Sequence, residues 1–215
     1  MHDNILLVDK PVGFSSFQIV RILKHFYKKV GHAGTLDPFA SGLLLILIGA
    51  ATKRFQEMQS YEKEYLGELI LGMATDTYDI SGVSVGQLRK PHNYSLQKLS
   101  ETADGFIGMI EQMPPRFSAI KQGGKKLYQL SRQGTYVIPK RRKVSIKAFH
   151  ILEFDDPKVK FSVVVGKGVY VRSLAHDFGS RLGCGATLMS LRRVRIGNYD
   201  VSQAKRINEI LDNNS

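Results

Sequence analysis

The sequence contains a single cysteine, Cys184, among its 215 residues. One thiol cannot form a disulfide within the chain, and it cannot supply the several thiolates of a cysteine-based zinc site. In the segment LGCGAT we interpret Cys184 as a small buried apolar residue. An internal disulfide, a cysteine-based zinc site and redox chemistry are therefore not expected.

Long apolar runs are also missing. No stretch approaches the roughly 18 residues that a membrane-spanning helix needs. The N-terminal segment MHDNILLVDKP has no basic region followed by a long apolar region, as a secretion signal would have. We therefore expect a cytoplasmic protein with no membrane partner. With 43% apolar residues, the chain can fill the core of an ordinary domain.

Acidic residues are scarce, and they are unevenly distributed. The chain has 31 Lys and Arg against 19 Asp and Glu, and the range 112–152 holds ten basic residues and no acidic one. A solvated basic face is one interpretation of such a run. Its length, and the interleaved Phe117, Tyr128 and Tyr136, favour contacts to phosphates and bases instead. Nucleic acid is therefore the expected partner, with a basic helix at 21–29 and the segment LRRVR as further candidates.

The hydrophobic pattern predicts both strands and helices. Strands are expected at 4–10, 42–49, 64–72, 143–154, 159–166 and 186–197, and helices at 15–30, 95–106, 170–183 and 202–211. On the strand at 143–154, Val144, Ile146, Ala148, His150 and Leu152 are expected on one face. Because the two kinds of element do not alternate strictly, an α+β fold with a mixed or antiparallel sheet is favoured over a doubly wound fold.

One short segment concentrates the features of a site. GHAGTLDPFASG, at 31–42, places Asp37 among three glycines and before Pro38. Glycines permit close approaches and unusual backbone angles, and proline stiffens the chain, so a rigid loop carrying one carboxylate is expected. Asp37 could instead cap a helix or close a turn. The composition alone does not name a reaction.

This segment resembles the signature of the TruB family of pseudouridine synthases, Gly-His-x-Gly-Thr/Ala-Leu-Asp-Pro-x-Ala-x-Gly. Four further blocks resemble the family in order: LLVDKPVGFSS, KEYLGELILGMATDTYDISG, PPRFSAIKQGGKKLYQLSRQG and GKGVYVRSLAHDFGSRLGCGATLMSLRRVRIG. The resemblance covers residues 4 to 205. A mild departure is Ala33, where the family often has Thr.

The resemblance implies the pseudouridine synthase fold, a largely antiparallel central sheet flanked by helices. It also implies an enzyme that isomerises uridine to pseudouridine, most often uridine 55 in the T-loop of tRNA, without a cofactor or a metal. The target base is flipped out, its glycosidic bond is broken, and the base is rejoined through carbon. Asp37 would be the nucleophile or base, Arg172 would pair with it, and Tyr65 would stack on the target base and could serve the late proton transfer.

The resemblance also assigns residues to substrate binding. His32 would enter the T-loop beside the flipped base, Tyr170 and Leu191 would line the pocket, and Lys10 would brace the site. A thumb insertion at 114–142 would close over the RNA, with Lys125, Lys126, Arg141 and Arg142 among its bases. Asp76 and Asp79 are expected to cap turns and support the site rather than to bind a metal.

Residues 1–215 are expected to form a single catalytic domain, acting as a monomer, without the separate C-terminal PUA-like RNA-binding domain of many family members. Two alternatives remain. A non-catalytic RNA chaperone on the same scaffold would not need Asp37, Tyr65 and Arg172, which are all present. A synthase subunit guided by a separate RNA would be expected to carry the C-terminal domain that holds the guide.

Overall fold

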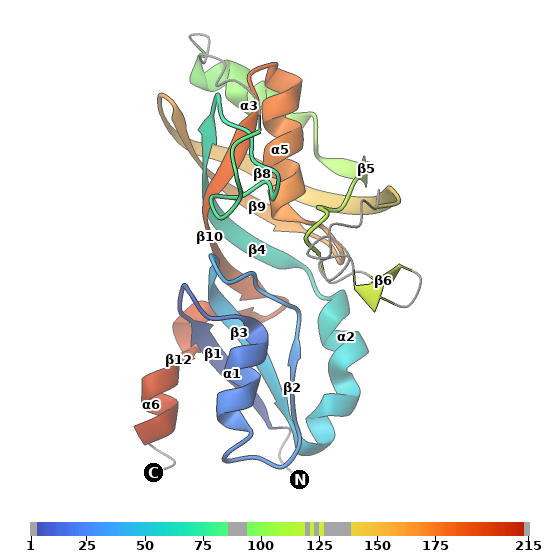
Figure 1. Ribbon diagram of the computed structural model, residues 1–215, viewed down its shortest axis with the longest axis vertical. Coiled ribbons are helices and arrows are strands. Elements are labelled where there is room, and N and C mark those ends of the chain that lie inside the picture. The colour runs from blue at the N-terminus through green and yellow to red at the C-terminus, as the bar shows by residue number, and fades with distance from the viewer. Residues whose placement is uncertain (1–3, 86–93, 119–120, 123–124, 127–138, 213–215) are drawn as a thin grey trace. The chain divides into compact units, whose positions relative to one another are not determined.

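The computed structural model describes residues 4–85, 94–118, 121–122, 125–126 and 139–212 (Figure 1). They form two compact units, described here as unit 1 (Met1–Leu66, Val164–Lys167 and Ser190–Ser215) and unit 2 (Gly67–Val163 and Gly168–Met189). The expected α+β class with a mixed, largely antiparallel sheet is confirmed. No helix in these described ranges is long and apolar enough to cross a membrane.

Unit 1 is built around the strand β3. Its strands are β1 (Ile5–Lys10), β2 (Val30–Ala33), β3 (Ser41–Ile48), β11 (Tyr199–Asp200) and β12 (Lys205–Arg206), with parts of β4 (Lys63–Leu71) and β10 (Ala186–Ile196). Its helices are α1 (Ser16–Leu23), α2 (Phe55–Ser60), α6 (Ile207–Asp212) and the 3₁₀ turns η1 (Gly49–Arg54) and η2 (Val201–Gln203). β3 pairs antiparallel with β1 and β2, and parallel with β10 at Ser41 and Gly42.

The apolar run of β3 is buried on both faces, which explains why it shows no polar alternation. Leu44 and Ile46 pack against Ile19 and Leu23 of α1, whereas Leu43, Leu45 and Leu47 belong to a second cluster with Met58 and Ile196. The helix α1 begins at a capping box, in which Ser15 and Gln18 bond each other's backbone N–H groups. Two apolar layers therefore fix β3, which begins just after the Asp37 loop.

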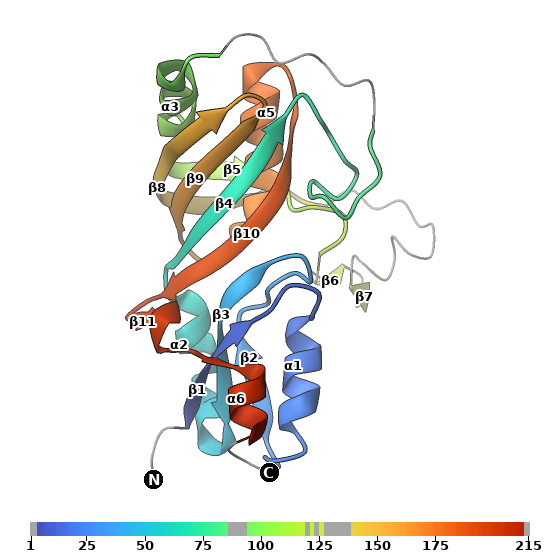
Figure 2. The same ribbon diagram turned by 90° about the vertical axis from the view of Figure 1, so that its left-hand side faces the viewer.

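Unit 2 contains β5 (Gly108–Gln112), β8 (Arg142–Asp155), β9 (Lys158–Val165) and the remaining parts of β4 and β10, with the short β6 (Lys121–Gln122) and β7 (Lys125–Lys126). Its helices are α3 (Leu96–Asp104) and α5 (Val171–Leu182). Figure 2 shows β8, β9 and β4 side by side, with α5 behind them. A cluster of four phenylalanine rings, Phe106, Phe149, Phe161 and Phe178, joins α5 to this sheet.

The predicted strands are present, but two helices differ from prediction. The helix expected at 15–30 ends at Leu23, because residues from Val30 pair with β3 as the unpredicted strand β2. The helix expected at 202–211 is wrong in its first half: η2 is capped by Asp200, β12 pairs with β1, and α6 begins at Ile207. The helix α2 was also not predicted.

The one-face prediction for β8 holds only for part of the strand. Val144 and Ile146 are buried, where β5 pairs with β8, but His150 and Leu152 are exposed. The even-numbered face is therefore buried only near the start of this 14-residue strand, and the next buried side chain is Phe149.

Gly42 is expected to be intolerant of a side chain for two separable reasons. Its φ of +102° disfavours any L residue, and an added Cβ would lie 2.3 Å from the carbonyl oxygen of Arg193. Gly13 has a similar φ of +89° with no atom within 4 Å of an added Cβ. We expect Gly42→Ala to lower the free energy of unfolding by at least about 2 kcal/mol more than Gly13→Ala, measured by urea denaturation. Equal losses would show that the approach of β10 is not limiting.

Candidate active site

Asp37 lies in the loop between β2 and β3, where both flanking residues are tied to the start of α1. Gly13 N–H donates to the carbonyl of Pro38 at 2.8 Å. The Ser16 hydroxyl donates to the carbonyl of Leu36 at 3.1 Å and accepts from its N–H at 2.8 Å. Asp37 itself is half-buried. The sequence predicts a rigid loop here, and three hydrogen bonds hold it at the two residues that flank Asp37.

A buried guanidinium supports the same loop from within. Arg193 on β10 is 1% exposed, and its Nε donates to the carbonyl of Leu43 at 2.7 Å. Its Nη2 donates to the carbonyl of Gly34 at 3.1 Å, and Nη1 lies 3.5 Å from the hydroxyl of Tyr65. The cation also lies over the Tyr65 ring, 5.9 Å from its centroid. Arg193 thus joins β3, the Asp37 loop and the predicted base-stacking tyrosine.

Lys10 is a second buried cation of unit 1. Its side chain is fully buried at the end of β1, and Nζ donates to the carbonyls of Pro11 at 2.8 Å and Phe14 at 2.6 Å. Burial lowers the pKa of Lys10 to about 8; the Asp37 carboxylate partly offsets this, and Arg193 adds to it. Lys10 therefore acts on the site in two ways, by fixing the segment before α1 and by placing positive charge within reach of Asp37.

The other predicted residues of unit 1 are placed on strands. His32 lies on β2, and burial, followed by the repulsion of Arg193, lowers its pKa, so its imidazole is neutral at neutral pH. Tyr65 on β4 and Leu191 on β10 are buried. Unit 1 thus carries five of the predicted site residues, Lys10, His32, Asp37, Tyr65 and Leu191.

Arg172 belongs to unit 2, where the first turn of α5 holds it. It is buried, and Nη1 forms an ion pair with the carboxylate of Asp79 at 3.2 Å. Nη1 also donates to the carbonyl of Thr77, and Nη2 to that of Phe117, each at 3.1 Å. These contacts fix the direction of the planar guanidinium, which a lysine could not reproduce.

Asp79 is held by its own loop. One carboxylate oxygen accepts hydrogen bonds from the Thr77 hydroxyl at 2.9 Å, the Ser81 N–H at 2.9 Å and the Ser81 hydroxyl. Asp76 accepts from the N–H of Val83 at 2.8 Å. Both acids therefore cap turns, as predicted, and Asp79 also supports Arg172. Within the described residues, no three His, Cys, Asp or Glu side chains are grouped as a metal site would require.

Tyr170 is the N-cap residue of α5, but its side chain does not cap the helix. The side-chain amide of Gln112 instead bonds the backbone of Tyr170 itself. Its Oε1 accepts from the Tyr170 N–H at 2.8 Å, and its Nε2 donates to the Tyr170 carbonyl at 3.1 Å. Ser173 adds a bond to the carbonyl of Met113 at 2.7 Å. The end of β5 thus fixes the helix turn that carries Tyr170 and Arg172.

The structure describes part of the predicted thumb. Arg142 on β8 lies over the Tyr170 ring, 5.2 Å from its centroid. Arg141 is exposed near Asp177, whose pKa burial raises to about 6 against the opposing effect of Arg141 and Arg181. Lys125 and Lys126 form β7, which pairs with β6, and only their backbone is described. Tyr128 and Tyr136 lie outside the described residues.

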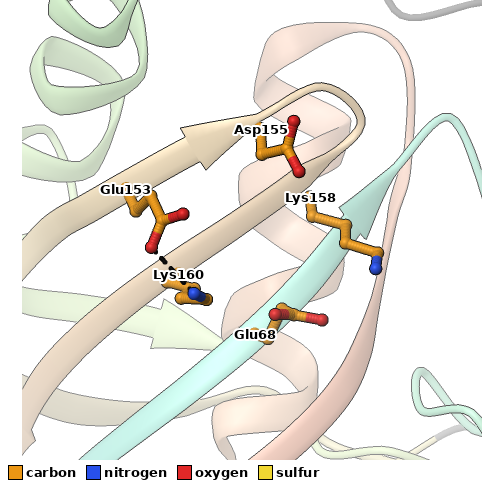
Figure 3. Close-up of a pocket in the computed structure, with 5 residues that line it drawn as sticks. All are labelled: Glu68, Glu153, Asp155, Lys158 and Lys160. Carbon is orange, nitrogen blue, oxygen red and sulfur yellow. Dashed lines mark hydrogen bonds and ion pairs between the residues drawn. The ribbon is translucent and has the colours of Figure 1, made fainter.

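A pocket elsewhere in unit 2 contains none of the predicted site residues. Figure 3 shows Glu68, Glu153, Asp155, Lys158 and Lys160 projecting from β4, β8 and β9. Lys160 pairs with Glu153 at 2.8 Å, and both side chains are more than half exposed. Acids and lysines alternate across neighbouring strands, which is typical of a solvated sheet face.

Two residues were not identified from the sequence as supporting residues. The segment LRRVR was a candidate for nucleic-acid contact, and this prediction is wrong for Arg193, which is buried and bonds to main-chain carbonyls. Gln112 and Arg193 each bond backbone groups of segments far away in the chain, so no local pattern marks them. The signal available for Arg193 was its place in an apolar strand, LMSLRRVRI, where an inward-facing base needs buried partners. The sequence around Gln112 gave no such indication.

Comparison with known families gives matches over most of the chain. The model of the TruB family pseudouridylate synthase (N terminal domain) matches residues 21–171, and that of the tRNA pseudouridylate synthase B C-terminal domain matches residues 172–215. The tRNA pseudouridine synthase B of Oenococcus oeni is 42% identical over 98% of this chain and 74% of its own length. That of Chlamydia felis is 44% identical over 94% of this chain and 86% of its own length.

Solved structures resemble the chain over nearly all of its length. A chain in the crystal structure of a Cbf5–Nop10–Gar1 complex is 28% identical, with a TM-score of 0.76 over 97% of this chain. A chain in an H/ACA RNP bound to a substrate RNA containing 2'-deoxyuridine is 26% identical, with a TM-score of 0.72. The present chain spans about half the length of these two, 53% and 52%.

Burial of Lys10 predicts a pH dependence of stability. Between about pH 8 and the ordinary lysine pKa of 10.5, the unfolded chain keeps the Lys10 proton and the folded chain has released it. The unfolded state then binds more protons, so stability rises with pH in this window. We expect Lys10→Met to reduce the rise in unfolding free energy between pH 7.5 and 9.5, measured by urea denaturation, whereas exposed Lys53→Met should leave it unchanged. An unchanged rise in the Lys10 variant would contradict the assignment.

The double hydrogen bond of Gln112 predicts that an amide cannot be replaced by its isosteric acid. Gln112→Glu keeps an acceptor for the Tyr170 N–H but points a carboxylate oxygen at the Tyr170 carbonyl. Since Gln112 is 1% exposed, we expect a loss of about 1 to 3 kcal/mol of unfolding free energy. Gln56→Glu, an exposed change of the same charge, is the control and should cost less than about 0.5 kcal/mol. Similar values for the two variants would remove Gln112 from this role.

Proposed function

Because the chain belongs to the TruB family of pseudouridylate synthases, we propose that it isomerises uridine to pseudouridine in tRNA. The curated relatives named tRNA pseudouridine synthase B are more than 40% identical over nearly the whole chain. The observation that carries the proposal is the environment of Asp37. A half-buried carboxylate lies in a loop braced at both flanking residues. The buried Lys10 interacts with this carboxylate, and the buried Arg193 bonds carbonyls of the same loop.

The chemistry requires a single carboxylate held in a fixed direction. Asp37 would attack the flipped nucleotide or remove a proton from it, so that the bond between C1' of the ribose and N1 of the base breaks. The freed uracil then turns and forms a bond from its C5 to C1', as Asp37 either leaves C1' or returns the proton that it removed. The proton on C5 is lost, and N1 takes up a proton. Lys10 interacts electrostatically with the Asp37 carboxylate, and Arg193 bonds the carbonyls of Gly34 and Thr35 in the same loop. Tyr65, held by the guanidinium of Arg193, would stack on the base and assist the proton transfer.

Arg172 is proposed to pair with Asp37 during the reaction, as the family resemblance implies. Its contacts with Asp79, Thr77 and Phe117 support this role, because they leave little freedom to a guanidinium that must meet a carboxylate in one orientation. Tyr170 and Leu191 would line the pocket for the extruded uridine, and His32 would occupy the space that the flipped base leaves. A neutral imidazole suits that position, because it can stack without placing a charge beside the bases.

The substrate site is proposed to be uridine 55 in the T-loop, with the enzyme acting in the cytoplasm on the T-arm of tRNA. The formal charge of +12 and the acid-free range 112–152 support phosphate contacts. We propose that Lys125, Lys126, Arg141 and Arg142 make them. We also propose that residues 1–215 form one catalytic domain with a thumb at 114–142.

The alternatives are less well supported. A non-catalytic RNA chaperone does not account for the bonds that hold the Asp37 loop and Arg172. A chain in the Cbf5–Nop10–Gar1 complex is 28% identical, whereas the relatives named tRNA pseudouridine synthase B are 42% and 44% identical, which favours the tRNA enzyme over a guide-dependent subunit. The test is incubation of the purified protein with unmodified tRNA alone, followed by mapping of pseudouridine. Absence of pseudouridine without a guide RNA would favour an alternative.

Asp37→Asn is expected to abolish turnover without abolishing RNA binding. The amide keeps the size of the side chain and removes the charge that the reaction uses, so the single-turnover rate should fall by several orders of magnitude. Exposed Asp104→Asn serves as the control and should retain the wild-type rate. Affinity for a T-arm hairpin, measured by filter binding, should change by less than about threefold. Substantial residual isomerisation by Asp37→Asn would exclude Asp37 from the mechanism.

A further inference from the structure

A second acid-free range precedes the Asp37 loop. Between Asp9 and Asp37 the chain has five Lys or Arg residues and no Asp or Glu. Lys10 is buried, but Arg21, Lys24, Lys28 and Lys29 are exposed. This range lies entirely in unit 1, so it is separate from the basic thumb of unit 2. A surface with many cations and no anions is suited to a polyanion.

Two of these cations, Arg21 and Lys24, lie on the exposed face of α1 and at its C-cap. Ile19, Val20 and Leu23 face the core, whereas Phe17 and Arg21 on the helix, and Lys24 at its C-cap, face solvent. The spacing of 17, 21 and 24 places these three side chains in one stripe along the helix. Its first member is apolar and its next two are basic. The Phe17 side chain is 65% exposed, and a large aromatic side chain is seldom left so exposed unless a binding partner covers it.

The apolar end of this stripe adjoins the catalytic loop. Val12 is 63% exposed and Phe14 is also exposed, so three large apolar side chains lie within six residues. Gly13 and Ser16, which lie among them, bond to Pro38 and Leu36 on either side of Asp37. Lys10 bonds the carbonyl of Phe14. The exposed apolar residues are therefore anchored directly to the loop that carries Asp37.

We propose that Val12, Phe14, Phe17, Arg21 and Lys24 form an RNA-binding surface, here called the α1 surface, for the strand next to the flipped uridine. The proposal rests on the proposed function. Unpaired bases of the loop contact the apolar end, and Arg21 and Lys24 contact phosphates as the strand leaves the site. RNA fits this combination, since its bases offer flat apolar faces and its backbone offers anions at short intervals. An apolar protein partner would leave the cations unpaired.

The test compares substitutions on the α1 surface with matched changes elsewhere in unit 1. Phe17→Ser and the double variant Arg21→Glu/Lys24→Glu are paired with Phe55→Ser and Lys205→Glu/Arg206→Glu, which are exposed and give the same changes in polarity and charge. Because every substituted side chain is exposed, the variants should fold, and thermal denaturation confirms this. The probe is an unmodified T-arm hairpin, with affinity measured by fluorescence anisotropy at several salt concentrations.

We expect Phe17→Ser to weaken hairpin binding by about fivefold or more, as the loss of a base-stacking aromatic does. The double charge variant should lower the slope of log affinity against log salt by about 1.4 to 1.8, which corresponds to two phosphate contacts. In both, KM should rise while the rate at saturating RNA stays within about threefold of wild type. The control variants should change affinity by less than twofold.

Wild-type affinity and salt slope in both α1 variants, or equal losses in their controls, would overturn the proposal. So would a wild-type protein that forms a dimer which Phe17→Ser dissociates, because the occupant would then be a second copy of the chain. These outcomes are distinct from failure of the proposed function, which would appear as absence of pseudouridine from wild-type reactions. Hairpin binding is measured without catalysis and remains informative in that case.

Discussion

The guanidinium of Arg193 is the contact on which the architecture of unit 1 depends. It is a buried cation that donates hydrogen bonds to the main-chain carbonyls of Leu43, Thr35 and Gly34. Carbonyl groups satisfy its donors without neutralising it, so its charge remains effective at Lys10 and His32, whose pKa values it lowers. The same residue explains Gly42, because the backbone of β10 passes too close to β3 for any side chain there. Arg193 therefore contributes to both the structure and the electrostatics of the Asp37 loop.

Unit 2 uses a different arrangement to hold its own arginine. Arg172 is paired with a carboxylate, and that carboxylate is in turn fixed by Thr77 and Ser81. The helix turn beneath it is fastened to β5 through Gln112 and Ser173. Neighbouring residues thus fix both the guanidinium of Arg172 and the helix turn that carries this residue. In both units the residues assigned to chemistry are few, and the residues that orient them are buried and polar.

Much of this was predictable from the sequence, and the failures have physical causes. β1, β3, β4, β8, β9 and β10 follow from their apolar content, and α5 from its period and the glycine that ends it. The error at 202–211 arose because Lys205 and Arg206 pair with β1, a contact between the two ends of the chain that no local pattern records. The motif located Asp37, but Gln112 and Arg193 act on segments more than 50 residues away, and only the folded chain brings these together.

The burial of Lys10 has a consequence for chemical labelling. Its amine is fully covered and donates to two carbonyls of the segment that is anchored to the Asp37 loop. An acylating reagent can reach this nitrogen only when that segment detaches, and detachment also removes the burial that lowers the pKa of Lys10. The rate at which Lys10 is modified, relative to the exposed lysines, therefore reports how often the Asp37 loop opens. A bound RNA that closes over the loop would slow this reaction at a residue it does not touch.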